Sequence, residues 1–225
     1  MHRVPNPAFE RDSPNRGRAP QFYVMPLITK FIAVIVATVV SGLAMAAAPS
    51  EPSPLQSRQR VSSTHGLSFL PPQGNNWLEQ FGENQITYLK RTDPKMVSFY
   101  AGALEGKLRS KLSTKEALVA FVRSKKDKWG NDGRFSDTSS SFQVEGKNES
   151  CVRYRLSAHD RGANNKAGHD FLVMLATGRF CVHPQDRTVA VDIYYSVRHV
   201  PQFDPKDFIA EGEEFLQSLQ FVTPP

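Results

Sequence analysis

The chain has 225 residues and a formal net charge of +6, from 28 basic and 22 acidic residues. The first 48 residues hold five of the basic and two of the acidic residues, so the remainder carries 23 against 20, a net charge of +3. So small an excess removes most of the support for nucleic-acid binding, and we expect no nucleic-acid partner.

The N-terminal quarter of the sequence predicts export. Residues 1–24 are rich in Pro, Arg and Asn and show no apolar periodicity, so we expect a non-structural extension that precedes a start at Met25. From there the sequence "MPLITKFIAVIVATVVSGLAMAAAPS" has a short start with one positive charge, an apolar stretch and a run of small residues. This three-part layout is typical of a secretory signal peptide over residues 25–48, with cleavage near Ala46–Ala48. The mature protein is then periplasmic or secreted.

A membrane anchor is the alternative for the same segment. Residues 31–48 give 18 uncharged residues, at the short end for a spanning helix, which needs roughly 20. The last third is mostly Ala, Gly and Ser, which favours cleavage, after which no stable membrane span would remain. Both interpretations stay open at this point.

After the signal, residues 49–65 are rich in Pro, Ser and Gln and predict a flexible leader. Residues 66–222 then predict a single domain. Its first part contains extended segments at 66–72, 85–91 and 96–108, of which the second alternates like a half-buried strand.

A helix is predicted over residues 113–129, where Ser113 and Glu116 form a capping box. Its apolar residues recur at helical spacing and its basic residues face mostly away from them. The inward side chains are Leu118, Phe121, Val122 and Trp129.

The second half of the domain alternates in the manner of paired strands and ends in a helix. Asp204 is expected to cap that helix and Pro205 to occupy its first turn. Strands dominate the whole, so the sequence predicts an α+β fold, an antiparallel sheet with helices packed on its faces. The expected segments are an edge strand near 134–147, strands at 149–160, 169–182 and 187–199, and the helix at 204–221.

This order of elements resembles the PsbP-like fold, an α/β/α sandwich that also occurs in small exported bacterial proteins. The resemblance is one of layout over residues 66–222 and is based on "GLSFLPP", the helix 113–129, "FCVHPQDRTVAVDIYYSVRH" and the closing "EEFLQSLQF". It implies an accessory or binding role rather than catalysis, and it assigns no functional residue.

Two cysteines, Cys151 and Cys181, lie in the part of the chain predicted to be exported, where paired cysteines usually crosslink. A hairpin loop centred on residue 164 pairs residues whose numbers sum to 328, and the two cysteines sum to 332. The sequence therefore predicts that they lie nearly opposite on neighbouring strands and form a disulfide.

Other chemistry at these residues is weakly supported. A metal site at Cys181 and His183 would need further ligands, and no C-x-x-C or H-x-x-x-H spacing is present, so we expect neither metal nor cofactor. A Cys–His nucleophile would need a free thiol. The familiar hydrolase and nucleotide-binding motifs are absent. The alternative of an envelope enzyme would use the two His-Asp pairs around one loop, His159, Asp160, His169 and Asp170.

The best candidate binding patch in the sequence is the basic run of the first helix, Arg123, Lys125, Lys126 and Lys128. It would meet an anionic surface or an acidic protein, although a solvated helix face is the commoner meaning of such a run. Tyr194, Tyr195 and Trp77 could line a cleft, but core packing suits them better. The sequence therefore favours a non-catalytic accessory or binding protein of the cell envelope whose partner is an unidentified envelope component.

Overall fold

The computed structural model describes residues 50–63, 65–92, 97–130, 133–145, 150–163 and 168–222. These residues belong to one compact unit. The predicted extension at 1–24 and the signal segment at 25–48 lie outside the described residues. Among the helices that are described, none is long and apolar enough to cross a membrane.

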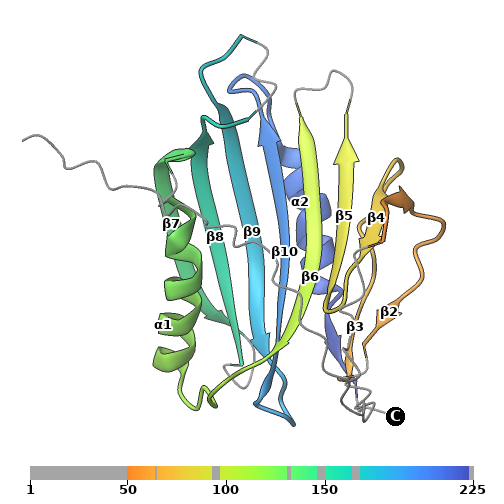
Figure 1. The fold of residues 1–225 in the computed structure, drawn as a ribbon, viewed down its shortest axis with the longest axis vertical. Coiled ribbons are helices and arrows are strands. Elements are labelled where there is room, and N and C mark those ends of the chain that lie inside the picture. Colours follow the sequence, from red (N-terminus) through yellow and green to blue (C-terminus); the bar gives the residue numbers. More distant parts are fainter. Residues whose placement is uncertain are drawn as a thin grey trace, which may run out of the picture. The chain divides into compact units, whose positions relative to one another are not determined.

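An eight-stranded antiparallel sheet is the frame of the domain (Figure 1), with strand order β1-β4-β5-β6-β10-β9-β8-β7. A smaller sheet has the order β11-β3-β2. The strands are β1 Ser53–Pro54, β2 Val61–Ser62, β3 Leu67–Phe69, β4 Leu78–Phe81, β5 Gln85–Arg91, β6 Ser98–Lys107, β7 Phe135–Glu145, β8 Cys151–Asp160, β9 Leu172–Val182, β10 Val189–His199 and β11 Gln220–Phe221.

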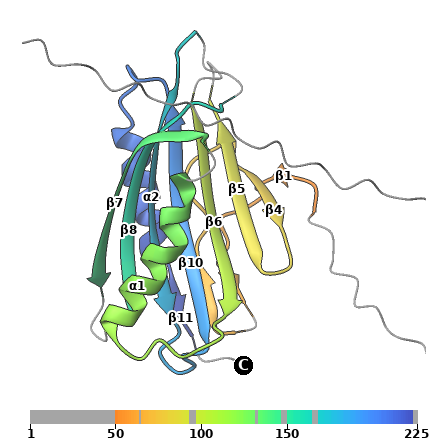
Figure 2. The same ribbon diagram turned by 60° about the vertical axis from the view of Figure 1, so that its left-hand side comes forward.

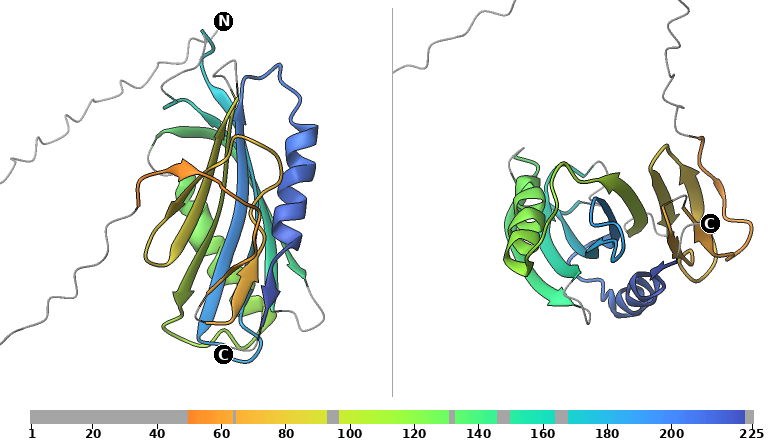
Figure 3. Two further views of the ribbon diagram at one scale, coloured as in Figure 1. Left: turned by 90° about the vertical axis from the view of Figure 1, so that its right-hand side faces the viewer. Right: turned by 90° about the horizontal axis from the view of Figure 1, so that it is seen from below.

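The described residues form two α-helices. The turned views show one on each face of the large sheet (Figures 2 and 3). Helix α1, Lys115–Lys126, contacts β7 and β8 and continues into a 3₁₀ turn, η1, at Asp127–Gly130. Helix α2, Lys206–Gln217, contacts β10 and β9 on the opposite face. The predicted α+β class, an antiparallel sheet with helices on its faces, is therefore confirmed.

The core has two parts because each strand sends alternate side chains to opposite faces. Under α2, Phe215 is fully buried and meets Phe69 and Tyr88 edge-on, with ring centroids 6.0 and 6.2 Å apart. Under α1, the buried residues are Leu118 and Val122 of the helix and Leu112, which precedes it, with Val152, Tyr154, Leu156, Ala176, Val182 and Ala190 of the sheet. The five β10 residues predicted to share one face, Val189, Val191, Ile193, Tyr195 and Val197, are all buried.

The helix starts differ from prediction by one residue. Thr114, not Ser113, caps α1, since its Oγ1 accepts the Ala117 N–H at 3.2 Å. Pro205 occupies the cap position of α2, and Asp204 accepts the Lys206 N–H at 3.2 Å from just outside the helix. The side chain of Trp129 lies outside the described residues.

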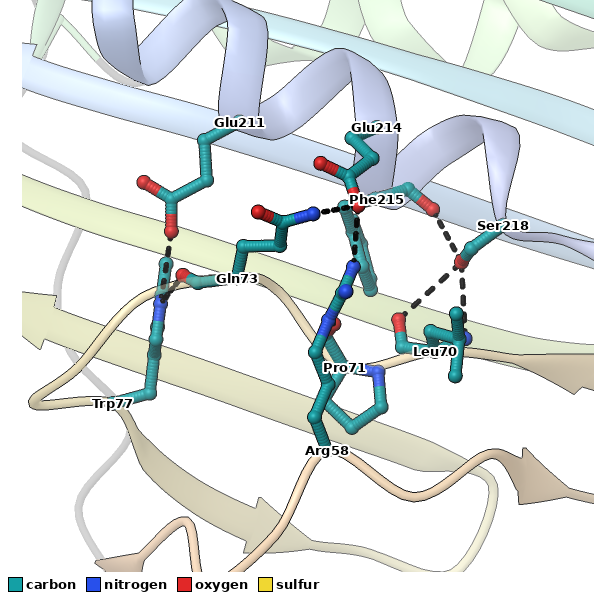
Figure 4. Close-up of polar contacts among 9 residues, drawn as sticks. All are labelled: Arg58, Leu70, Pro71, Gln73, Trp77, Glu211, Glu214, Phe215 and Ser218. Carbon is teal, nitrogen blue, oxygen red and sulfur yellow. Dashed lines mark hydrogen bonds and ion pairs between the residues drawn. The ribbon is translucent and has the colours of Figure 1, made fainter.

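The predicted flexible leader, residues 49–65, is part of the fold where it is described. Strand β1 pairs with β4, and β2 pairs with β3. Arg58 donates to Pro71 O at 2.9 Å and to Glu214 of α2 at 2.8 Å (Figure 4). The Trp77 indole N–H, from the following loop, reaches Glu211 of α2 at 3.0 Å. These contacts fasten the N-terminal strands to the last helix.

Candidate binding surface

A groove opens beside α2 because the helix covers only part of its face of the sheet. Gly212 sits directly on the Tyr195 ring, and any Cβ at that position would overlap the ring, so the helix lies close against β10. Beyond the helix, Arg155 of β8 and Ser139 and Ser141 of β7 are exposed. The resulting groove has a volume of about 410 Å³. We call it the α2 groove; it is lined by Ser139, Ser140, Ser141, Arg155, Leu156, Ser157, Leu175, Ala176, Thr177, Tyr195, Val197, Ile209, Gly212 and Glu213.

The strand register arranges the groove floor in two rows that run from the sheet edge towards α2. One row is Ser141, Arg155, Thr177 and Tyr195, and the other is Ser139, Ser157, Leu175 and Val197. The Ser139 and Ser157 hydroxyls are hydrogen-bonded at 2.8 Å. The groove is therefore hydroxyl-rich near β7 and apolar near α2, where Ile209 is 42% exposed.

Arg155 is the cation of this groove that has no partner in the described part of the chain. Arg153, two residues earlier on the same face, is bound by Glu213 and by Glu145 at 3.4 Å. Arg179, opposite Arg153 on β9, also pairs with Glu145, at 3.2 Å. Since those carboxylates are already shared between the two inner arginines, the exposed Arg155 guanidinium is available to an anionic ligand.

One further polar atom in the groove wall lacks a partner. The Tyr195 side chain is 4% exposed, and its hydroxyl makes no hydrogen bond within the described residues. Burial raises the Tyr195 pKa well above its ordinary value, and the nearby Glu211 carboxylate adds to this. The hydroxyl is therefore a neutral donor.

Strand β7 forms the outer edge of the sheet next to this groove. Val182 N donates to Ser150 O at 2.8 Å, which fixes the alternation of the β8–β9 ladder. The backbone groups of even-numbered β8 residues therefore bond to β9, and those of odd-numbered residues bond to β7. On β7, the residues that bond to β8 are 139, 141, 143 and 145. It follows that the backbone N–H and C=O groups of Ser140, Phe142 and Val144 point away from the sheet.

The other face of β7 also carries grooves and a cation. Arg123 of α1 lies over the Phe142 ring, 5.3 Å from its centroid. Val144 and Arg123 line an open groove of about 370 Å³. Ser140 contributes to a further groove of about 220 Å³ at the end of α1. Grooves on both faces of the sheet therefore meet at one edge strand.

Three of the four residues of the predicted basic patch are exposed, namely Arg123, Lys125 and Lys128. Lys126 is the exception and corrects the prediction. Its Nζ lies 2.6 Å from Asp192 Oδ2 and 4.2 Å from the centroid of the Tyr154 ring, with only 11% of the side chain exposed. Lys126 follows the buried Val122 by four residues, a spacing that places both on one helix face and that could have been read from the sequence.

The Tyr154 hydroxyl donates to the other oxygen of Asp192 at 2.7 Å. Burial, with the Asp192 charge, raises the Tyr154 pKa well above its ordinary value. Gly178 makes this contact possible, because a Cβ there would overlap the Tyr154 hydroxyl. The Lys126–Asp192–Tyr154 cluster ties α1 to the sheet.

One of the two predicted His-Asp pairs, His159 and Asp160, makes contacts with other parts of the fold. His159 Nδ1 lies 2.8 Å from Asp137 and its ring stacks on Phe171 at 3.8 Å. Asp160 is fully buried: Nε and Nη2 of Arg134 each donate to one of its carboxylate oxygens at 2.8 Å, and Arg198 Nε lies 3.2 Å away. Burial alone would raise the Asp160 pKa, but the hydrogen bond and charges of the two arginines lower it below its ordinary value.

His169 and Asp170, the other pair, precede β9, where Asp170 is exposed, and neither residue lines the α2 groove. The interactions of His159 and Asp160 are thus internal to the fold.

Cys181 and His183 have structural roles. Cys151 and Cys181 are directly opposite in the β8–β9 register and form the predicted disulfide. His183 Nδ1 accepts the backbone N–H groups of Gln185 and Asp186 at 3.2 and 3.1 Å, so the imidazole holds the β9–β10 turn. In the described part of the chain no group of three or more His, Cys, Asp or Glu is placed to hold a metal ion.

A further cavity, of about 280 Å³, lies between the two sheets and was not expected from the sequence. His65 Nδ1 is paired with Glu105 Oε1 at its wall, beside Phe81 and Ile86. A carboxylate-oriented imidazole is a common form of general base. His65 immediately precedes "GLSFLPP", but no motif marks it.

No family model and no curated protein matches this chain. Among solved structures it is similar to a mutant form of the protein Mog1, with a TM-score of 0.45 and 10% identity, covering 73% of this chain and 95% of that chain. The predicted PsbP-like resemblance is therefore wrong: the similarity found is to Mog1, and no family model supports PsbP. Its basis was the order of strands and helices, which unrelated α+β domains share.

Proposed function

We propose that the protein is exported to the cell envelope and acts there as a non-catalytic binding or accessory protein that holds its partner at the β7 end of the large sheet. The observation that carries the proposal is the edge strand β7, with grooves on both faces and the available Arg155 beside it. Binding residues gathered at one exposed edge suit a recognition role.

Export is supported by the signal-like residues 25–48 and by the disulfide between Cys151 and Cys181. Disulfides persist in oxidising compartments, of which the periplasm and the extracellular space are examples. A periplasmic or secreted location therefore agrees with both features, and a retained N-terminal anchor is the alternative.

The competing function, an envelope enzyme, has its best geometry at His65 and Glu105 rather than at the predicted His-Asp pairs. It would use the His65 imidazole as a base in the cavity between the sheets. A substitution His65→Ala would abolish such an activity and leave partner binding at β7 unchanged, which separates the two functions.

Photo-crosslinking in intact cells tests the proposed function. A photoreactive amino acid replaces Ser140 on β7 or, as control, the exposed Gln217 on α2, and mass spectrometry identifies the mature N-terminus. We expect crosslinks to an envelope component from position 140 only, on a chain that begins after Ala46–Ala48. A cytoplasmic chain with Met1 or Met25 intact, or equal crosslinking from both positions, would contradict the proposal.

A further inference from the structure

We infer that the partner supplies an extended acidic segment that pairs with β7 as an additional strand of the large sheet. The inference deepens the proposed binding role and rests on it. Three features support it: the backbone groups of β7, the charges on its two sides, and the unsuitability of other occupants.

The backbone of β7 is prepared for strand addition. From Ser139 to Glu145 it pairs without interruption with β8, and the bulge lies before this stretch, between Ser136 and Ser139. Residues 138–144, "TSSSFQV", contain no charge and no proline, two features that usually protect an edge. The outward N–H and C=O groups of Ser140, Phe142 and Val144 can therefore pair with an incoming strand.

The opposite edge of the sheet differs. Its last strand, β1, is the two-residue segment Ser53–Pro54, which includes a proline. Edges as short as this offer few backbone groups to a partner. The sheet therefore presents a long edge at β7 only, within the described residues.

Cations flank β7 on both faces. Arg155 lies opposite Ser141 on the α2 side, and a strand added to β7 would run two strand spacings, roughly 10 Å, from β8. Since Ser141 is small, the long Arg155 side chain can extend over it towards the added strand. On the other face, Arg123 lies over Phe142, and Lys125 and Lys128 are exposed.

Side chains of an added strand alternate between these two faces, so acidic residues in it would meet a cation on either side.

Charge also decides against two other occupants. A second copy paired edge to edge would bring Arg155 and Arg123 of one copy towards those of the other, and like charges oppose such pairing. Residues 1–48 of this chain carry five basic and two acidic residues, the wrong sign for this edge. The fitting partner is therefore an acidic segment of another protein.

Two fluorescein-labelled nonapeptides of alternating Val and Thr test the inference, one with two Glu and the other with two Lys at the same central positions. Binding to the full exported chain is measured by fluorescence anisotropy, and contact is mapped from amide chemical shifts. We expect the Glu peptide to bind at least tenfold more tightly than the Lys peptide. The shifts should centre on the amides of Ser140, Phe142 and Val144.

Substitutions at Ser140 separate backbone pairing from side-chain contact. Ser140→Pro removes an outward N–H while every β7–β8 ladder bond remains, because proline is tolerated on an edge strand. Ser140→Pro should lower the affinity for the Glu peptide at least tenfold. Ser140→Ala keeps the N–H, so its affinity for the same peptide should stay within twofold of that of the unsubstituted chain. Arg155→Glu should lower the affinity for the Glu peptide at least fivefold and raise the affinity for the Lys peptide. This measurement is independent of whether the Ser140→Pro variant folds.

Four results would overturn the inference: no binding of the Glu peptide at millimolar concentration, equal binding of both peptides, unchanged binding by both Ser140→Pro and Arg155→Glu, or self-association through β7. Crosslinking from position 140 on an exported chain together with any of them would leave the proposed function intact and refute only the strand-addition mode.

Discussion

The disulfide between Cys151 and Cys181 allows a prediction with a calculable size. It joins residues 30 apart, so it closes a loop of about 30 residues in the unfolded chain. The chain-entropy relation gives a loss of about 12 cal/mol/K for such a loop, or about 3.6 kcal/mol at 25 °C. Because β8 and β9 also pair strand to strand from Cys151–Cys181 to Asp160–Leu172, we expect the crosslink to act mainly through the unfolded state.

Urea unfolding followed by circular dichroism measures the effect. The oxidised chain is compared with the same chain kept reduced and with a C151A/C181A variant. We expect the free energy of unfolding to fall by about 3–4 kcal/mol on reduction. The double variant should lose somewhat more, because both cysteine side chains are buried and their sulfur atoms leave small cavities.

A thermal scan gives an independent reading. For a domain of this size, 1 kcal/mol corresponds to roughly 2–4 °C, so the midpoint should fall by roughly 7–14 °C on reduction. If oxidised and reduced chains unfold within 1 kcal/mol of each other, the loop-entropy reasoning is refuted. If the chain purified without reductant has two titratable thiols after denaturation, the pairing itself is refuted.

Substitutions at three further positions test individual contacts by urea unfolding. Gly178→Ala should lower the free energy of unfolding by about 1–3 kcal/mol, because the added Cβ displaces Tyr154. An unchanged urea midpoint would refute that contact. His183→Ala should lower the free energy of unfolding by about 1–3 kcal/mol, because two N–H groups of the turn lose their acceptor. His183→Asn can retain an acceptor and should lower it less. Equal losses in the two variants would contradict this role of His183. Because the pKa of Asp160 is lowered in the folded chain, its contribution to the free energy of unfolding is fully present above its unfolded pKa of about 3.9. That contribution is lost as the pH falls through the folded pKa. Asp160→Asn should therefore lower stability at neutral pH and flatten the dependence of stability on pH below about pH 4. A variant profile parallel to that of the unsubstituted chain would refute the role given to the arginines.

Local pattern was sufficient for the long strands β5 to β10 and for the disulfide, but not for the exact register or for the short strands β1, β2 and β4. The Cys151–Cys181 pairing places the centre of symmetry at residue 166 rather than 164. The reason is the start of β9, which begins at Leu172 and not at His169. Phe171 made the strand look longer from the sequence, whereas in the fold it stacks on His159.

Long-range contacts explain what the sequence did not reveal. Residues 50–63 look like a linker by composition, yet Arg58 and Arg60 bind groups 156 and 158 residues away on and after α2. The α2 groove is equally non-local, since its floor comes from four strands and its wall from α2. Arg155 could be placed on an exposed face by alternation, but its lack of a counter-ion within the described residues depends on how Glu145 and Glu213 are shared.

The two ends of β8 show how the edge is held for binding. Cys151, at the start of β8, is opposite Glu145 at the end of β7, and Asp160, at the end of β8, is opposite Phe135 at the start of β7. The disulfide fixes the first position and the Arg134–Asp160–Arg198 cluster fixes the second. The strand that supports β7 is therefore tied down opposite both ends of β7. A partner that adds to a strand so held loses little free energy to ordering it, which makes β7 a better binding edge than its exposure alone would suggest.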